Sequence, residues 1–316
     1  MISFENIVKS YRGKRKLHDV SFRVKKGERL VLLGGSGSGK TTLLKMVIRL
    51  IDPTAGRILL DGEDIVKKNL IALRRQVGYA IQDTGLFEHM TVQDNIAILL
   101  RLLGYKEAFI QERVYELLCM VRLDPEEFGQ KLPRQLSGGQ GQLVGAARVF
   151  AHWPKIALMD EPFGGLDPIT RSELQSECID LQTKLDTTMI FVTHDVQEAV
   201  KMGDRIVLLR EGEVQQIGTP ADLICYPKNE FVAAFFSHQK FQLFMNMKKL
   251  GKMALQQGRP QRTRLGVNQT LLDAMNTFFE EEADTISIYR KEVFLGNISK
   301  ELILQELQSL WRQGNG

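Results

Sequence analysis

A glycine-rich segment early in the chain carries the residue types that bind phosphate. It reads Gly34-Gly35-Ser36-Gly37-Ser38-Gly39-Lys40-Thr41, which fits the pattern GxxxxGK[ST]. Glycines allow the backbone to wrap closely around a phosphate group, because no Cβ atom intervenes. The free amides at the start of the following helix then attract the anion. We expect Lys40 to reach the β- and γ-phosphates of a nucleotide, and the Thr41 hydroxyl to ligate Mg²⁺, with Thr42 in the same turn.

Two further apolar runs end in side chains that suit phosphate chemistry. Residues 156–159 are wholly apolar, and Asp160 and Glu161 follow them directly. Ligand sites in α/β proteins lie at the carboxyl ends of strands, so Asp160 is placed to hold Mg²⁺ and Glu161 to polarise an attacking water. The run 189–192 leads to His194, which we expect to contact the γ-phosphate.

The pattern of elements indicates how these groups are brought together. Apolar runs alternate with helical periodicity, which predicts an α/β fold with a largely parallel sheet. A helix ended by Asp52-Pro53 is expected to follow the glycine-rich segment. Strands are predicted in residues 2–33 and 57–83, and helices in 41–51, 91–129 and 168–185.

A third motif indicates the protein family. Leu136-Ser137-Gly138-Gly139-Gln140 precedes a predicted helix, where its small residues would expose amides to phosphate. Its position between the phosphate loop and the acidic strand resembles the signature of ABC ATPases, and the resemblance covers residues 1 to about 237. It implies a P-loop cassette with a RecA-like parallel sheet core, an antiparallel β subdomain and a helical signature subdomain.

The same resemblance assigns further roles. Tyr11 matches the aromatic residue that stacks on adenine, and Gln82 matches the glutamine that contacts Mg²⁺ and water. Residues 165–167 match the D-loop, with Asp167 at its end, and His194 matches the switch histidine. The family therefore implies ATP and Mg²⁺ as ligands and an ATP hydrolase as the activity.

Family membership also implies an assembly. Two cassettes would pair head to tail as a homodimer, with Lys40 and Thr41 of one chain and Ser137 and Gly139 of the other closing on each ATP. Opening and closing would drive two transmembrane permease subunits, contacted near residues 83–92 and supplied by an extracytoplasmic substrate-binding protein. The chain would then lie at the cytoplasmic face of the plasma membrane.

The chain departs from the family pattern after the signature. Gly141 and Leu143 stand where relatives usually carry Gln and Arg, and Gly164-Gly165 stands where Ser-Ala is common. Gly141 lowers helix propensity by up to ~1 kcal/mol relative to Ala. None of these residues is a phosphate ligand, so we still expect hydrolysis, with a slower or differently coupled cassette as a hypothesis.

The cargo is indicated by less specific stretches. Residues 43–56, 78–82 and 85–92 look like those of importers for glycine betaine, choline, carnitine and proline betaine. Two alternatives stay open: an importer or exporter ATPase for another cargo, such as an amino acid or a sulfonate, and a soluble ABC ATPase without a transport role.

The remainder of the chain predicts a helical linker over 238–264 and a small module over 265–316. A helix near 271–275, a hairpin over 285–298 and a last helix capped by Ser299 resemble a single CBS motif. Such modules accompany quaternary-amine importers as sensors. A dimerisation module without a ligand is the alternative.

Composition and the distribution of charged, cysteine and apolar residues argue against other classes of protein. The net charge of +4 is too small to predict nucleic-acid binding, and the basic run Arg12, Lys14, Arg15, Lys16 reads as a solvated loop. The three cysteines, 119, 178 and 225, are too scattered for a zinc site. No signal segment is evident, and no apolar stretch reaches the roughly 18 residues that a spanning helix needs, so a membrane role requires partners.

Overall fold

The structure, a computed structural model, describes residues 1–81, 85–237, 240–253 and 255–313. It divides into two compact units, Met1–Ile217 and Gly218–Gly316. The predicted boundaries after residues 237 and 264 both lie inside the second unit, and the predicted assignment of domains stays a prediction.

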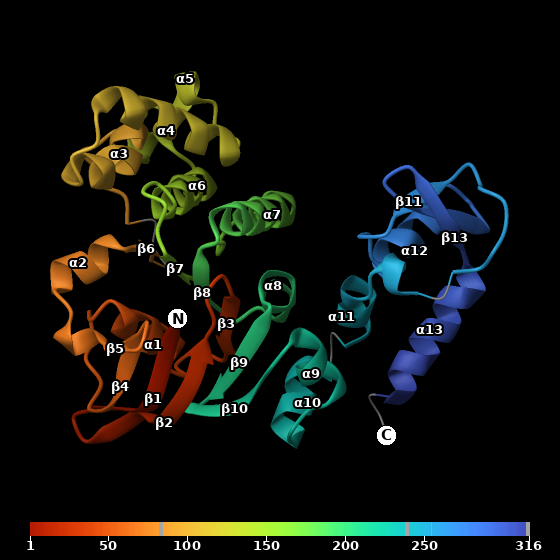
Figure 1. Cartoon of the computed structure of the whole chain (residues 1–316), viewed down its shortest axis with the longest axis horizontal. Helices are drawn as coiled ribbons and strands as arrows, with labels where there is room; N and C mark the ends of the chain where they lie inside the picture. Colours follow the sequence, from red (N-terminus) through yellow and green to blue (C-terminus); the bar gives the residue numbers. More distant parts are fainter. Residues whose placement is uncertain (82–84, 238–239, 254, 314–316) are drawn as a thin grey trace. The chain divides into compact units, whose positions relative to one another are not determined.

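A six-stranded sheet forms the centre of the first unit, in the order β10-β9-β3-β8-β7-β6 (Figure 1). Neighbouring strands from β9 to β6 run parallel. Every residue of β7 and β8 is buried, which explains why both strands are apolar apart from Asp160 and the threonines at their ends. The strands are β3 (Arg29–Gly34), β6 (Val77–Ala80), β7 (Ile156–Asp160), β8 (Thr188–Thr193), β9 (Arg205–Arg210) and β10 (Glu213–Gly218).

An antiparallel sheet, ordered β2-β1-β4-β5, stands beside this core. It consists of β1 (Ile2–Tyr11), β2 (Lys14–Val24), β4 (Ala55–Leu60) and β5 (Glu63–Asp64). Arg12 and Gly13 form the β1–β2 turn, with φ of 48° and 80°. The prediction of a loop for the basic run was wrong beyond this turn, because Lys14 and Arg15 pair with β1.

The helix after the phosphate loop is shorter than expected. It was predicted to continue to Ile51, but α1 spans Lys40–Val47. Arg49 has φ of 50° and leaves the helical path. The guanidinium of Arg74 donates to the carbonyl oxygens of Ile48 at 3.0 Å and Arg49 at 2.8 Å. A side chain distant in sequence thus satisfies the orphan carbonyls at this helix end.

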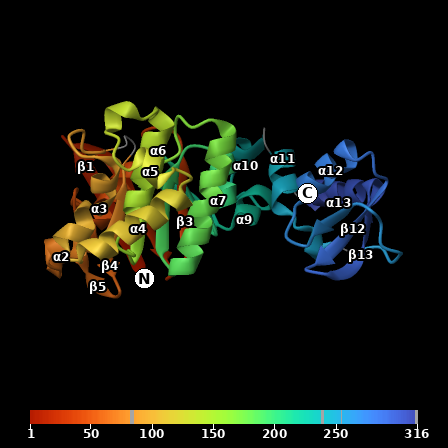
Figure 2. The ribbon, with the colours of Figure 1, turned by 90° about the horizontal axis from the view of Figure 1, so that it is seen from above.

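Helices α3 (Val92–Leu102), α4 (Glu107–Met120), α5 (Pro125–Phe128) and α6 (Gly138–Val149) lie together in both views (Figures 1 and 2). The expected helical stretch 91–129 is divided, because Gly104 and Arg122 have φ of 81° and 57°. Helix α7 (Pro168–Leu185) has the predicted bounds. The first unit also contains α2 (Leu70–Arg75) and α8 (Val196–Met202).

The second unit contains a three-stranded sheet ordered β11-β12-β13, of which β12 and β13 are labelled in Figure 2. The predicted hairpin is confirmed as the antiparallel pair β12–β13. The hydrophobic core of the second unit includes Leu250, Phe278 and Ile298. Its elements are α9 (Pro220–Cys225), α10 (Glu230–Ser237), α11 (Lys240–Met247), β11 (Arg264–Gly266), α12 (Leu271–Glu280), β12 (Thr285–Arg290), β13 (Val293–Ser299) and α13 (Lys300–Gln313). The likeness to a CBS motif stays a prediction.

Candidate active site

The phosphate loop joins β3 to α1 and is shaped by its glycines. Gly34 has φ of 153°, and a Cβ atom there would lie 2.2 Å from the carbonyl oxygen of Leu209. The amide of Ser38 donates to the carbonyl of Gly35, closing the turn. The hydroxyl of Ser38 is buried, and among the described residues it has no hydrogen-bond partner. A phosphate oxygen is the kind of acceptor that this hydroxyl requires.

Lys40 places a buried cation inside the loop. Its side chain is 6% exposed, and its Nζ donates to the carbonyls of Gly34 at 2.8 Å and Gly35 at 2.9 Å. Burial lowers the pKa of Lys40, while the nearby carboxylates of Glu161 and Asp160 oppose that shift. A desolvated ammonium among free amides is a strong site for an anion.

Thr41 and Asp160 bring two hard oxygen ligands together. Asp160 ends β7, is 3% exposed, and accepts a 2.9 Å hydrogen bond from the Thr41 hydroxyl. Burial raises the pKa of the Asp160 carboxyl, and the Thr41 hydrogen bond opposes that rise. In the described part of the chain, no cluster of three His, Cys, Asp or Glu could hold a metal by itself. One carboxylate and one hydroxyl suit Mg²⁺, which retains waters and shares substrate phosphates.

Glu161 and His194 form a contact at the ends of neighbouring strands. Glu161 Oε1 lies 3.1 Å from His194 Nδ1. Glu161 has φ of 48°, a left-handed conformation that is unusual outside glycine, and its amide donates to the carbonyl of Val192 at 3.0 Å. Backbone strain of this kind clusters at active sites. The predicted pairing of strand ends therefore does bring the acid, the histidine and the phosphate loop to one sheet edge.

The signature motif opens α6 with a reciprocal cap. The hydroxyl of Ser137 accepts from the amide of Gln140 at 3.2 Å, and the side chain of Gln140 accepts from the amide of Ser137 at 2.9 Å. This capping box satisfies the amides of Ser137 and Gln140, and the amides of Gly138 and Gly139 belong to the first turn of α6, where a helix offers no intrahelical acceptor. They are available to an anion.

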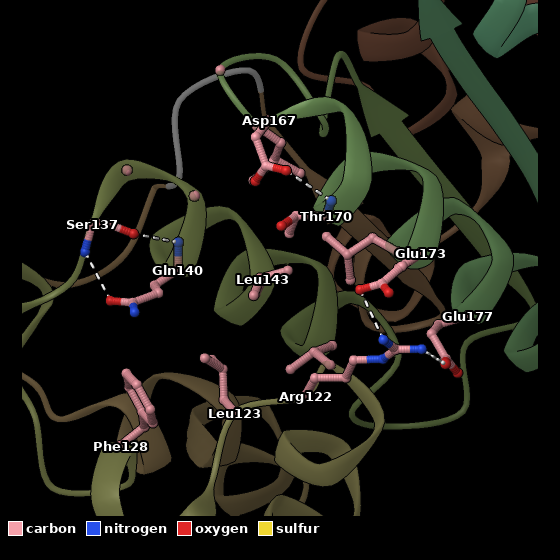
Figure 3. A pocket seen from close by; sticks show the side chains of 16 residues that line it. Arg122, Leu123, Phe128, Ser137, Gln140, Leu143, Asp167, Thr170, Glu173 and Glu177 are labelled. Carbon is pink, nitrogen blue, oxygen red and sulfur yellow. Dashed lines mark hydrogen bonds and ion pairs between the residues drawn. The ribbon is translucent and has the colours of Figure 1, made fainter.

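The signature lines a cavity of about 650 Å³ together with the segment that precedes α7. In Figure 3, Ser137 and Gln140 lie on one side of this cavity and Asp167 and Thr170 on another. Asp167 caps α7 by accepting from the amides of Ile169 and Thr170. The Thr170 side chain, together with these two amides, lowers the pKa of Asp167. The lining residues, as far as the chain is described, include none from the phosphate loop. The signature cavity and the phosphate loop are therefore separate features of one chain.

Comparison with known proteins identifies the family of this chain. Residues 17–164 match the family described as "ABC transporter". The choline transport ATP-binding protein OpuBA of Bacillus subtilis is 42% identical over 307 residues, which cover 96% of this chain and 80% of that protein. This chain belongs to the ATP-binding proteins of ABC transporters. It is an ATP hydrolase with the ABC cassette fold, as the sequence predicted.

Two further relatives agree with this assignment. The glycine betaine/carnitine/choline transport ATP-binding protein OpuCA of Bacillus subtilis is 41% identical over 307 residues, covering 96% of this chain and 80% of that protein. A solved dimeric structure of MJ0796, described as a bacterial ABC transporter cassette, superposes with a TM-score of 0.65 at 32% identity. It covers 70% of this chain and 99% of that one.

Tyr11 and Gln82 are the remaining predicted site residues. Tyr11 ends β1 with 46% of its side chain exposed, and Lys9 Nζ lies 5.0 Å from its ring centroid. Its ring is therefore open for stacking. Gln82 lies outside the described residues. No helix in the described ranges has the length and apolarity needed to cross a bilayer.

Three side chains near the site were not recognised from the sequence. Lys16 Nζ donates to the carbonyl of Gly37 in the phosphate loop. Gln142 Nε2 donates to the carbonyl of Gly164, in the segment that follows Asp160 and Glu161. Glu198 accepts from the hydroxyl of Thr193, next to His194. Lys16 lies in the basic run of residues 12–16. No local sequence pattern predicts the hydrogen-bond partner of any of these three side chains.

Proposed function

We propose that this ABC ATPase powers the import of a quaternary amine such as glycine betaine, choline or carnitine. The observation that carries the proposal is the extent of the match. Similarity to transport ATPases named for choline and for glycine betaine, carnitine and choline covers 96% of this chain. It thus continues beyond the catalytic motifs, which all ABC ATPases share, into the second unit.

Within the site, we assign the triphosphate of ATP to residues 34–42. Thr41, Asp160 and Gln82 would hold Mg²⁺, which supplies charge neutralisation between the β- and γ-phosphates. Lys40 would compensate charge on the same phosphates. The contact between Glu161 and His194 supports a joint task, in which Glu161 orients and deprotonates the attacking water while His194 contacts the γ-phosphate.

We further propose that two copies of this chain act as a pair. The signature cavity and the phosphate loop are separate in one chain, so each half-site requires a complement. Ser137, Gly138, Gly139, Gln140 and Asp167 would then face the ATP held by the other copy. The pair would act on two transmembrane permease subunits at the cytoplasmic face of the plasma membrane, supplied by an extracytoplasmic substrate-binding protein.

The test is ATP hydrolysis by the transporter assembled in liposomes with its binding protein. Glycine betaine, choline, carnitine, amino acids and sulfonates would be offered in turn, with the Glu161→Gln assembly as the background. We expect stimulation by quaternary amines alone. Stimulation by amino acids or sulfonates alone would replace the cargo proposal, and cargo-independent hydrolysis would favour an ATPase without this transport role.

A further inference from the structure

The carboxylate of Glu198 lies in a buried polar cluster beside the proposed catalytic pair. Glu198 belongs to α8 and is 8% exposed. Its Oε2 accepts a 2.6 Å hydrogen bond from the hydroxyl of Thr193, the last residue of β8. Its Oε1 accepts from the amide of Gln175 on α7 at 3.3 Å. One side chain therefore joins three elements.

Thr193 connects this carboxylate to His194. The hydroxyl of Thr193 also accepts from the amide of Asp195 at 3.0 Å, so the residues on both sides of His194 are held by one hydroxyl. Asp195 in turn caps α8 by accepting from the amide of Glu198 at 3.2 Å. The His194 side chain is 68% exposed, so little packing orients it. Its position at Glu161 depends on the backbone that Thr193 and Asp195 hold.

Arg171 extends the cluster to the segment before α7. Its Nε lies 4.0 Å from Glu198 Oε1 and, in the chain as described, is buried without a hydrogen-bond partner. Glu198 is therefore its counter-charge. The Nη2 of Arg171 donates to the carbonyl of Leu166 at 2.9 Å, immediately before Asp167.

Because the cluster is buried, its charged and polar groups depend on one another for partners. Burial raises the pKa of Glu198, and the Thr193 hydrogen bond and the Arg171 charge oppose that rise. A buried carboxylate that loses its partners is strongly unfavourable. A shift of the segment around Leu166 would therefore disturb the contacts of Glu198, and through Thr193 the placement of His194.

We propose that Glu198 is a positioning residue that couples the Leu166–Asp167 segment to His194. The proposal rests on the roles proposed above for His194 and Asp167. Since Asp167 would face the second ATP of the pair, the cluster gives each active site a mechanical connection to the other. Glu198 acts through other residues, so its loss should reduce kcat and leave KM for ATP nearly unchanged.

The experiment measures kcat and KM for ATP in the full-length chain. We expect Thr193→Val to lower kcat at least about fivefold with KM within about twofold, and Thr193→Ser, which keeps the hydroxyl, to retain kcat. Glu198→Ala should behave like Thr193→Val. Gln182→Ala is the matched control, because Gln182 is 3% exposed on α7, the helix that carries Arg171 and Gln175, and donates to the carbonyls of Gly27 and Thr187 instead. It should lower the melting temperature and leave kcat unchanged.

A double-mutant cycle tests the coupling between Arg171 and Glu198. Arg171→Met combined with Glu198→Gln should lower kcat no more than the stronger single change, because both interrupt one connection. Additive losses would overturn the coupling, and so would a kcat in Glu198→Ala that matches Gln182→Ala. His194→Ala separates the two proposals. If it abolishes hydrolysis while Glu198→Ala leaves kcat unchanged, the positioning role alone fails; an unchanged kcat in His194→Ala means that the role assigned to His194 is wrong.

Discussion

The hydroxyl of Thr41 donates to Asp160 across 2.9 Å, although 119 positions separate the two residues in the chain. This hydrogen bond joins the start of α1 to the end of β7 and prearranges two oxygen ligands. Both residues are proposed to hold Mg²⁺, so their contact leads directly to a first prediction.

Thr41→Val should raise the Mg²⁺ concentration for half-maximal hydrolysis about tenfold or more, because it keeps the shape of the side chain and removes a ligand oxygen. Thr41→Ser retains the hydroxyl and should stay within about twofold of the original. The measurement is a titration of hydrolysis with Mg²⁺ at saturating ATP. Equal midpoints for the two variants would show that the hydroxyl does not ligate the ion.

Glu161→Gln should lower hydrolysis by about 10²-fold or more and preserve ATP binding, because an amide cannot accept the proton of the attacking water. Glu211→Gln is the matched control, since Glu211 is exposed and also left-handed, with φ of 50°. Hydrolysis and equilibrium ATP binding are measured for both. Unchanged hydrolysis in Glu161→Gln would instead favour a regulatory role without catalysis by this residue.

Ser137→Ala should have two effects, because Ser137 both caps α6 and faces the signature cavity. Loss of the cap costs about 1 kcal/mol. Thr270→Ala removes a capping box of the same kind from α12 in the second unit. We expect comparable losses of stability in thermal unfolding, but reduced hydrolysis only in Ser137→Ala. Equal hydrolysis in the two variants would limit Ser137 to a structural role.

Leu143→Arg restores the charge that relatives usually carry after the signature. Leu143 is 7% exposed and borders the same cavity as Glu173 and Glu177, which already pair with Arg122. The cavity has room for a guanidinium, so we expect the basal hydrolysis rate to rise. Leu143→Met, a volume-conserving change, should leave the rate unaltered. No increase in Leu143→Arg would end the idea that Leu143 slows this cassette.

His152 should make stability depend on pH. It is 8% exposed, and burial lowers its pKa below the ordinary 6.5, an effect that the backbone of Arg75 opposes. Below pH 6.5 the unfolded chain therefore binds the proton more readily than the folded one. The contribution of neutral His152 is complete above pH 6.5 and declines as the pH falls through 6.5 toward the folded pKa.

The check is thermal unfolding between pH 7.5 and 5. His152→Gln removes the titrating group, so its melting temperature should fall less on acidification than that of the original chain. The difference is limited to about 1.4 kcal/mol per pH unit for one proton. His89→Gln, a change at an exposed histidine, should follow the original chain across the range. Parallel curves for all three proteins would contradict the assignment to His152.

The residues of the candidate site could be proposed from the sequence because each motif is local. The phosphate loop, the acids after one apolar run and the histidine after another are each readable within a few positions, and parallel strands end at one edge. The sequence by itself also determined the family and the cassette fold, because the motifs occur in one order along the chain. Burial on both faces requires apolar strands, so β3, β7 and β8 were visible as runs.

Only the tertiary structure decided which distant groups complete the site. Arg74 ends α1 at Val47, and Glu198 joins β8 to α7, through contacts that no local pattern encodes. The separation of the signature cavity from the phosphate loop is likewise a property of the packed chain. The physical reason is that buried polar groups must find partners wherever folding brings them, and that choice depends on packing rather than on spacing.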